Sequence, residues 1–223
     1  MQHLGAASGR RIAKEILVPR QDTIVDLIRH GEPLGGRMIR GQGVDHPLSA
    51  LGWQQMRAAV GDDNPWDLIL SSPMARARDF ASELAARHGL PLAVDPELRE
   101  VAMGAWEGRR PTELAEEEPA TFSAFRRDPV ANRPPGGERL EALQARIGRA
   151  YDRQVATYPG RHLLIVCHAG VSRAIVGHVM DADPQHWYRI RIDYAGLTRV
   201  RHDRYGISLE FVNAQRLRSW RHP

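Results

Sequence analysis

The sequence predicts an α/β fold in which a mostly parallel central sheet is covered by helices on both faces. Short apolar runs typical of buried strands alternate with longer stretches whose apolar residues recur at helical spacing. Strands that alternate with helices form a parallel sheet with helices packed on each side, which gives a three-layer α/β/α sandwich. The 223 residues show no internal repeat and no linker, so we expect a single domain.

The first half of the chain contains two predicted units of strand and helix, followed by one more strand. We expect strands at residues 23–28, 67–70 and 92–94. Ser49 is expected to cap a helix that runs to about Val60. The pair Ser72-Pro73 predicts the start of a second helix, which ends at Gly89.

The second half begins with a charged insert at about 109–137, in which Pro119 separates two short helical stretches. The predicted elements that follow are a long amphipathic helix at 139–158, a strand at 163–167, a helix to about 180, and a closing hairpin with strands at 197–201 and 207–212. We therefore assign one domain to residues 22–223 and a polar, basic extension to residues 1–21. The edge of the hairpin could pair with a second copy, so we include a homodimer among the expected states.

Composition excludes several classes of protein. Cys167 is the only cysteine, which excludes an intramolecular disulfide and a zinc site built on thiolates. No apolar stretch is long enough to cross a bilayer and the start has no secretory signal, so we expect a cytoplasmic protein without a membrane partner. The net charge is +4, and the arginines are scattered among acids rather than gathered in a stripe, so we expect no nucleic-acid partner.

Polar side chains that can bind a ligand or take part in a reaction follow the predicted strands. Arg29 and His30 end the first strand and His168 follows the strand at 163–167. Arg76 lies one turn into the second helix, and Glu100 lies in the loop after the third short strand. Because ligands in such folds bind beyond the carboxyl ends of the strands, we expect these five side chains to converge at one edge of the sheet.

Two histidines, two arginines and a carboxylate suit phosphoryl transfer. A neutral imidazole nitrogen is a nucleophile toward phosphorus near neutral pH. Arg29 and Arg76 can bind the phosphoryl oxygens in pairs and meet the negative charge that spreads over them. His168 can add a further donor, and Glu100 can give a proton to the leaving oxygen and later take one from water. The sequence therefore predicts hydrolysis of a phosphate monoester with His30 as the nucleophile.

The same residues lie in motifs that resemble those of the histidine phosphatase superfamily, the phosphoglycerate mutase-like proteins. The resemblance covers about 23–213 and rests on six motifs in family order: Leu27–Glu32 (LIRHGE), Gly41–Gly52, Ser71–Ala77 (SSPMARA), Leu98–Gly108, Pro135–Glu138 (PGGE) and Val166–Gly170 (VCHAG). It implies a phosphohistidine on His30, a phosphate pocket of Arg29, Arg76 and His168, proton transfer by Glu100, and neither metal nor cofactor.

Among the branches of the family, the sequence is most similar to the α-ribazole phosphatase type. This implies a small-molecule partner, α-ribazole 5'-phosphate or a related nucleoside or sugar phosphate. Many relatives have an asparagine after the RHGE motif that touches the phosphate, and here residues 33–36 offer none. Arg37 or Arg40 is a candidate substitute. Mutases of the family carry a longer insert than this chain, which favours hydrolysis. The alternative is cofactor-dependent phosphotransfer of the phosphoglycerate mutase type.

Three other interpretations compete. Cys167 and Arg173 have the spacing of the phosphate loop of cysteine-dependent phosphatases, although that chemistry leaves Arg29, His30 and Glu100 without a function. The pocket could also belong to a phosphate- or phosphopeptide-binding module without turnover. RNA binding through arginine is the third, and it predicts affinity that falls steeply with salt.

Overall fold

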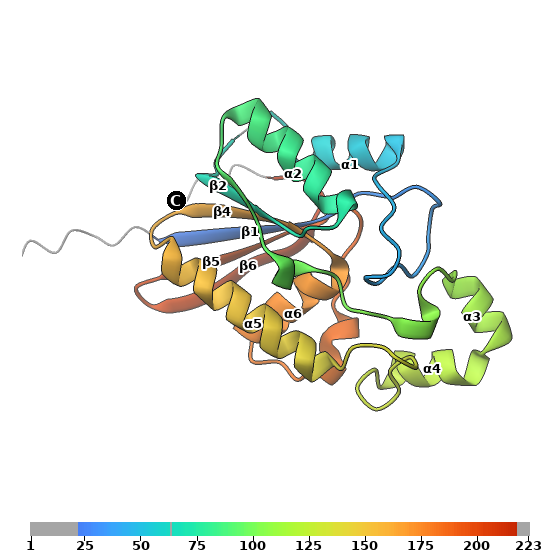
Figure 1. The fold of residues 1–223 in the computed structure, drawn as a ribbon. Coiled ribbons are helices and arrows are strands. Elements are labelled where there is room, and N and C mark those ends of the chain that lie inside the picture. Colours follow the sequence, from blue (N-terminus) through green and yellow to red (C-terminus); the bar gives the residue numbers. More distant parts are fainter. Residues whose placement is uncertain (1–21, 63, 218–223) are drawn as a thin grey trace, which may run out of the picture.

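The computed structural model describes residues 22–62 and 64–217 and shows a single twisted sheet between two layers of helices (Figure 1). Within these residues the sheet has six strands, in the order β3 (Leu92–Val94), β2 (Leu68–Ser71), β4 (His162–Cys167), β1 (Thr23–Arg29), β5 (Leu197–Asp203) and β6 (Gly206–Ala214). The pairs among β3, β2, β4 and β1 are parallel, whereas β5 is antiparallel to both β1 and β6. The predicted α/β sandwich with a mostly parallel sheet is confirmed.

The helices divide between the two faces of the sheet (Figure 1). One face is covered by α1 (Ala50–Val60) and α2 (Ala75–His88), which form a core with Ile28. The other face is covered by α5 (Leu140–Thr157) and α6 (Ala169–Val179), which form a second core with Leu27. Adjacent residues of β1 thus face opposite cores, as the period of two in a strand requires.

The insert forms α3 (Pro111–Glu117) and α4 (Pro119–Arg127), which project beside the sandwich (Figure 1). Pro119 stands at the first turn of α4, where its missing N–H leaves no helical hydrogen bond unmade. Three short 3-10 helices were not predicted: Pro96–Leu98, Gly104–Trp106 and Pro184–Arg189. No helix among the described residues has the length and apolar character that a membrane span requires. The extension proposed for residues 1–21 lies outside the described residues.

The start of α2 differs from the sequence-based expectation. The helix begins at Ala75 and not at Pro73, and the side chain of Ser72 is not its N-terminal cap. Instead, both carboxylate oxygens of Asp45 accept a hydrogen bond from the backbone N–H of Ala75, at 2.9 and 3.0 Å. An aspartate from another loop therefore satisfies the N–H of Ala75, whereas the Ser72 hydroxyl accepts from the backbone N–H of Met74, just before the helix, at 3.3 Å.

A buried ion pair explains how β1 accommodates an acid in an apolar run. Asp26 is completely buried and accepts hydrogen bonds from Nε and Nη2 of Arg199 at 2.7 and 2.9 Å. The indole N–H of Trp66 and the ring of His162 also contact its carboxylate. Burial raises the pKa of Asp26, but the hydrogen bonds from His162 and Arg199 outweigh burial, so the pKa is lowered and the carboxylate stays ionised.

Candidate active site

A small cavity lies at the carboxyl end of the central strands. Its volume is about 50 Å³, and it is lined by Arg29, His30, Met38, Arg40, Gly41, Arg76, Glu100 and Tyr194. The register explains why the two histidines meet: Arg29 of β1 pairs with Cys167 of β4, so His30 and His168 both come directly after paired positions. Their ring centroids are 5.2 Å apart, with an edge-to-face arrangement. We call this space the phosphate cavity.

The position of His30 defines which of its nitrogens can react. Its Nδ1 lies 2.8 Å from the backbone carbonyl oxygen of Gly31. A carbonyl oxygen can only accept, so Nδ1 carries the proton and Nε2 keeps a free lone pair. The pKa of His30 is well below its usual value because the ring is buried and because the cations Arg29 and Arg76 disfavour a further positive charge. His30 is therefore a neutral imidazole with its nucleophilic nitrogen selected.

Gly31 allows the chain next to His30 to approach α1 closely. A Cβ at Gly31 would lie 2.2 Å from the carbonyl oxygen of Gly52, at the start of α1. This close approach packs the loop after β1 against α1, and any side chain at residue 31 would push the two apart.

His168 is completely buried and immediately precedes α6. Its Nε2 lies 2.7 Å from the hydroxyl oxygen of Ser72, which also accepts from the backbone N–H of Met74. Within the described structure its Nδ1 is buried without a hydrogen-bond partner. Burial and the neighbouring cations Arg76 and Arg29 hold the pKa of His168 well below its usual value. When Nε2 accepts from Ser72, Nδ1 carries a proton that it can donate to a ligand.

Three arginines hold their guanidinium groups in place through backbone carbonyls. Arg29 donates to Ile192, Arg76 donates to Gly41 and Val44, and Arg40 donates to Leu34 and Gly36, all at 2.7–3.1 Å. These carbonyls bind only the Nη atoms. In the described structure the Nε of each of the three arginines is buried without a partner. Because a buried unpaired donor is costly, the three side chains are arranged for an acceptor that enters the cavity.

The loop between β1 and α1 is fixed so that Arg76 keeps its position. Glu107 accepts hydrogen bonds from the backbone N–H groups of Gln42 and Gly43 at 3.0 and 2.7 Å. A Cβ at Gly41 would lie 1.9 Å from the Glu107 carboxylate, and Gly41 has a φ of +52°. Asp45 continues the loop and accepts from Arg76 at 3.3 Å. The motif around Glu107 thus holds the carbonyl groups that orient Arg76.

Glu100 brings its carboxylate to the first turn of α6. Its Oε1 accepts from the backbone N–H of Gly170 at 3.0 Å and of Val101 at 2.9 Å. Gly170 is required at this contact, because a Cβ there would lie 2.3 Å from Oε1. The carboxylate therefore stands at the border of the cavity that His30 also lines, where a proton could be exchanged with a bound ligand.

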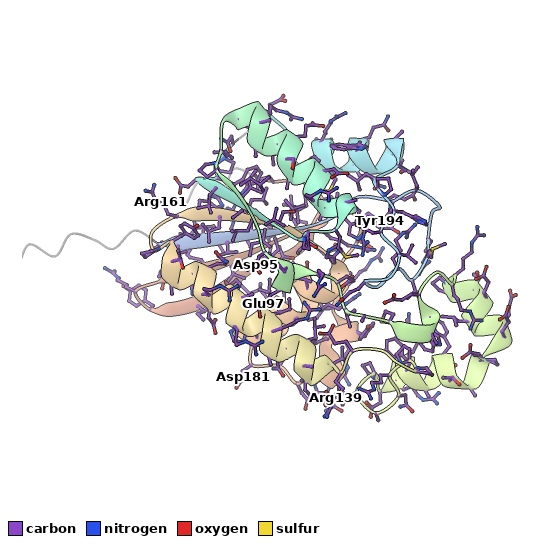
Figure 2. The ribbon with its side chains drawn as sticks, viewed as in Figure 1. Asp95, Glu97, Arg139, Arg161, Asp181 and Tyr194 are labelled. Carbon is purple, nitrogen blue, oxygen red and sulfur yellow. The ribbon has the colours of Figure 1, made fainter. Side chains whose placement is uncertain are left out.

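Tyr194 is a residue of the cavity that the sequence reasoning missed. It lies just before β5, at the same end of the sheet as the strand ends (Figure 2). The guanidinium carbon of Arg29 is 4.2 Å from the centre of its ring, and its hydroxyl forms a hydrogen bond with Arg40. The tyrosine thus joins two of the arginines. Because β5 is antiparallel to β1, the beginning of β5 lies beside the end of β1. An aromatic residue shortly before β5 was therefore the one signal in the sequence that could have placed Tyr194 in the cavity.

The structure separates the two candidate substitutes for the missing asparagine. Arg40 is buried and lines the phosphate cavity, whereas Arg37 is exposed and lines a neighbouring cavity beside α3 and α4. The other candidates, Arg29, His30, Arg76 and Glu100, line the phosphate cavity, and His168 contacts His30.

The geometry of the loop after β4 does not support cysteine chemistry. Cys167 is completely buried, and burial raises the pKa of its thiol to about 12, so the thiolate is absent at neutral pH. Arg173 points elsewhere, since its Nε donates to the carbonyl of Ile190 at 2.9 Å.

The groups that surround the cavity fit an anion. Its border carries three guanidinium groups, and within the described residues no cluster of three or more histidine, cysteine, aspartate or glutamate side chains has the arrangement of a metal site. A buried neutral imidazole among fixed cations, with a carboxylate at the edge, is the arrangement that transfer of a phosphoryl group to histidine requires.

Comparison with known proteins identifies the family of the chain. A model of the histidine phosphatase superfamily (branch 1) matches residues 25–215, and the chain belongs to this superfamily. It is 33% identical over 176 residues to a bifunctional protein of Mycobacterium tuberculosis, covering 77% of this chain and 48% of that protein. The chain thus spans about half the length of this relative.

Two further likenesses cover most of both chains. The adenosylcobalamin/alpha-ribazole phosphatase of Escherichia coli is 29% identical over 172 residues, which are 75% of this chain and 84% of that protein. The structure of mycobacterial glucosyl-3-phosphoglycerate phosphatase with inorganic phosphate superposes with a TM-score of 0.74 at 28% identity, covering 86% of this chain and 97% of the other. Both of these relatives are named as phosphatases, and the fold of this chain is that of the phosphoglycerate mutase-like proteins.

Proposed function

We propose that this protein hydrolyses a small-molecule phosphate monoester through a phosphohistidine on His30, without a metal ion. The observation that carries the proposal is the state of His30: its ring is neutral, the carbonyl of Gly31 selects Nε2 as the free nitrogen, and three guanidinium groups line the same cavity. The cavity of about 50 Å³ is suited to a phosphoryl group rather than to a whole substrate.

In the first step, Nε2 of His30 attacks phosphorus and the bond between phosphorus and the ester oxygen breaks. Glu100, in its protonated form, gives its proton to the leaving oxygen, so that a neutral alcohol departs. Arg29, Arg76 and Arg40 bind the equatorial oxygens through the Nε–H groups that have no protein partner. His168 adds its Nδ1–H.

In the second step, a water molecule attacks the phosphohistidine. The carboxylate of Glu100 accepts a proton from this water, the bond between phosphorus and Nε2 breaks, and inorganic phosphate leaves. Glu100 and His30 are then in their initial states. The charge that a divalent cation would neutralise in other phosphatases is met by the guanidinium groups, which is why we propose chemistry independent of metal.

Transfer of the phosphoryl group to water rather than to a second alcohol is supported by the names of the two relatives described above, both phosphatases. Another relative, 29% identical over 180 residues, is named as a probable phosphoglycerate mutase, and phosphotransfer of that type is the alternative. The names of the two phosphatases also supply two candidate substrates, α-ribazole 5'-phosphate and glucosyl-3-phosphoglycerate. We propose a nucleoside or sugar phosphate of this kind.

The test is release of phosphate from p-nitrophenyl phosphate in excess chelator, with His30→Ala as the variant and His186→Ala as the control. We expect turnover and a phosphorylated intermediate of one phosphoryl group per chain in the wild type and the control, and neither in His30→Ala. Undiminished turnover by a folded His30→Ala protein would contradict the mechanism. If no substrate in a panel of nucleoside and sugar phosphates is turned over but phosphate raises the Tm, the site is a binding module.

A further inference from the structure

The segment just before β5 is bound to the end of β1, which fixes Tyr194 beside His30. The backbone N–H of Ala195 donates to the carbonyl oxygen of His30 at 3.4 Å, and Nη1 of Arg29 donates to the carbonyl oxygen of Ile192 at 2.8 Å. Ala195 has a φ of +54°, a left-handed conformation that a residue other than glycine keeps only when its surroundings hold it there. Tyr194 is therefore held in place by the backbone on both sides of it.

The ring of Tyr194 packs against the proposed nucleophile. Its centroid is 5.9 Å from that of the His30 ring, and the guanidinium carbon of Arg29 lies over the ring at 4.2 Å from the centroid. Tyr194 is half-buried and lines the phosphate cavity together with both of these residues. The phenol thus forms part of the wall of the space that the phosphoryl group would enter.

The hydroxyl group of Tyr194 has a hydrogen that no protein group accepts. Its oxygen forms a hydrogen bond with Arg40, and a guanidinium group can only donate, so the phenol oxygen is the acceptor. Within the parts of the chain that the structure describes, no hydrogen bond runs from this hydroxyl to a protein acceptor. The O–H of Tyr194 is therefore available to a ligand in the phosphate cavity.

A phosphoryl group in the cavity can accept more hydrogen bonds than the donors named so far can supply. Those donors are the Nε–H groups of Arg29, Arg40 and Arg76 and the Nδ1–H of His168. Each of the three phosphoryl oxygens has lone pairs for about two hydrogen bonds, so these donors leave positions open. Negative charge spreads over the same oxygens during transfer, and a donor that is already in place stabilises it without reorganisation.

From these observations we infer that Tyr194 is a catalytic residue whose hydroxyl donates a hydrogen bond to the phosphoryl group while that group is transferred to and from His30. This inference rests on the proposed function and adds one donor to its mechanism. Arg40 holds the phenol oxygen and cannot accept, so the hydroxyl hydrogen is not shared with it. No covalent bond to Tyr194 forms or breaks, and the phenol keeps its proton throughout both steps.

The first test is Tyr194→Phe, which removes the hydroxyl and keeps the ring over Arg29. We expect kcat/KM on p-nitrophenyl phosphate to fall by about 10- to 100-fold, the range for a hydrogen bond to a charged acceptor. Tyr205→Phe is the matched control, because Tyr205 makes the same two kinds of contact with an arginine, Arg204, at the exposed end of the hairpin of β5 and β6. The control should keep the activity of the wild type.

A second test separates donation to the phosphoryl group from support of Arg40. Fluorine next to the hydroxyl makes a phenol a stronger hydrogen-bond donor and a weaker acceptor. We would replace Tyr194 by such a fluorotyrosine and measure kcat/KM at about pH 6, where both phenols are protonated. We expect the ratio of the kcat/KM values, fluorotyrosine over tyrosine, to exceed one. If Tyr194 only accepted from Arg40, the ratio would be one or lower.

Equal kcat/KM in the wild type and Tyr194→Phe, or a fluorotyrosine ratio of one or lower, would overturn the inference. Failure of the proposed function has a different outcome, because the wild type itself would then turn over no phosphate monoester. In that event, calorimetric titration with inorganic phosphate compares the Kd of the wild type with that of Tyr194→Phe. A weaker Kd in the variant would support donation by Tyr194 to a bound phosphate, whereas equal values, or no binding to either protein, would overturn it.

Discussion

Arg146 on α5 holds the backbone of Glu100, donating from Nη2 to the carbonyl oxygen of Glu100 at 3.1 Å. The same guanidinium donates to the carbonyls of Glu97 and Arg99, and its Nε and Nη2 bind the carboxylate of Glu138 at 2.7 and 2.8 Å. One half-buried side chain thus fixes the segment that leads to the proposed proton donor. Arg146 acts on Glu100 through the backbone and does not line the phosphate cavity.

We expect Arg146→Ala to lower kcat on p-nitrophenyl phosphate by about 10- to 100-fold, because misplacement of a catalytic group by a fraction of an ångström is costly. KM should change less, since the phosphate cavity keeps its arginines. Steady-state kinetics measures the effects on kcat and KM separately. Arg149→Ala is the control: Arg149 is exposed on the same helix and lies 3.4 Å from Glu97. Equal kinetics of the two variants would show that Arg146 does not position Glu100.

The pKa of His30 predicts its titration. Burial and the charges of Arg29 and Arg76 lower this pKa well below 6.5, so the ring stays neutral as the pH falls through 6.5. We expect the His30 resonance in NMR, assigned with His30→Ala, to show no titration between about pH 6 and 8. Arg29→Gln removes one cation and should raise the pKa. The protein unfolded in urea is the control, where the histidines titrate near 6.5. A folded-state midpoint at 6.5 or above would contradict a nucleophile kept neutral by its neighbours.

The buried ion pair of Asp26 with Arg199 makes a prediction about stability. We expect Asp26→Ala to lower the free energy of unfolding by about 3–5 kcal/mol, because it leaves the buried guanidinium of Arg199 without its carboxylate. Asp79→Ala is the matched control, since Asp79 pairs with Arg78 at the surface and should change stability by less than about 1 kcal/mol. Urea unfolding measures both. Similar losses in the two variants would mean that the buried pair has no special contribution.

Cys167 should resist alkylation. Its thiol is completely buried and has a pKa of about 12, so iodoacetamide at pH 7.5 should neither add mass to the native chain nor reduce turnover of p-nitrophenyl phosphate. Cys167→Ala serves as the control for slow reaction at other residues. If iodoacetamide inactivates the wild type but not Cys167→Ala, the result would support a mechanism that depends on Cys167.

Much of the site could be located from the sequence because it follows the strands. Arg29, His30 and His168 lie at the ends of apolar runs, and the parallel order of the sheet brings such ends together. The choice between Arg37 and Arg40 could not be made in this way. Both lie in a glycine-rich loop without periodicity, and only the path of that loop decides which side chain turns inward.

Contacts between distant loops could also not be predicted from the sequence. The sequence offers Ser72 before Pro73 as a helix cap, but the helix starts two residues later, where Asp45 binds the N–H of Ala75. Ser72 binds the N–H of Met74 and the ring of His168. Tyr194 lies on an irregular segment, where no hydrophobic period marks a residue as part of a site. Local patterns thus predicted the elements, whereas the partners of loop residues depend on the tertiary structure.

The aromatic packing of the insert has a consequence for how substrate preference can diversify. Phe125 of α4 contacts Trp106 and Tyr188 with ring centroids 5.2 and 4.9 Å apart, so the insert has its own anchoring contacts away from the phosphate cavity. Exchange of residues 109–137 for the corresponding segment of a relative, with Trp106 and Tyr188 retained, should transplant that relative's selectivity while the chemistry at His30 stays in place. On this expectation the insert is a replaceable module, and enzymes of this architecture would gain new substrates by recombination within it.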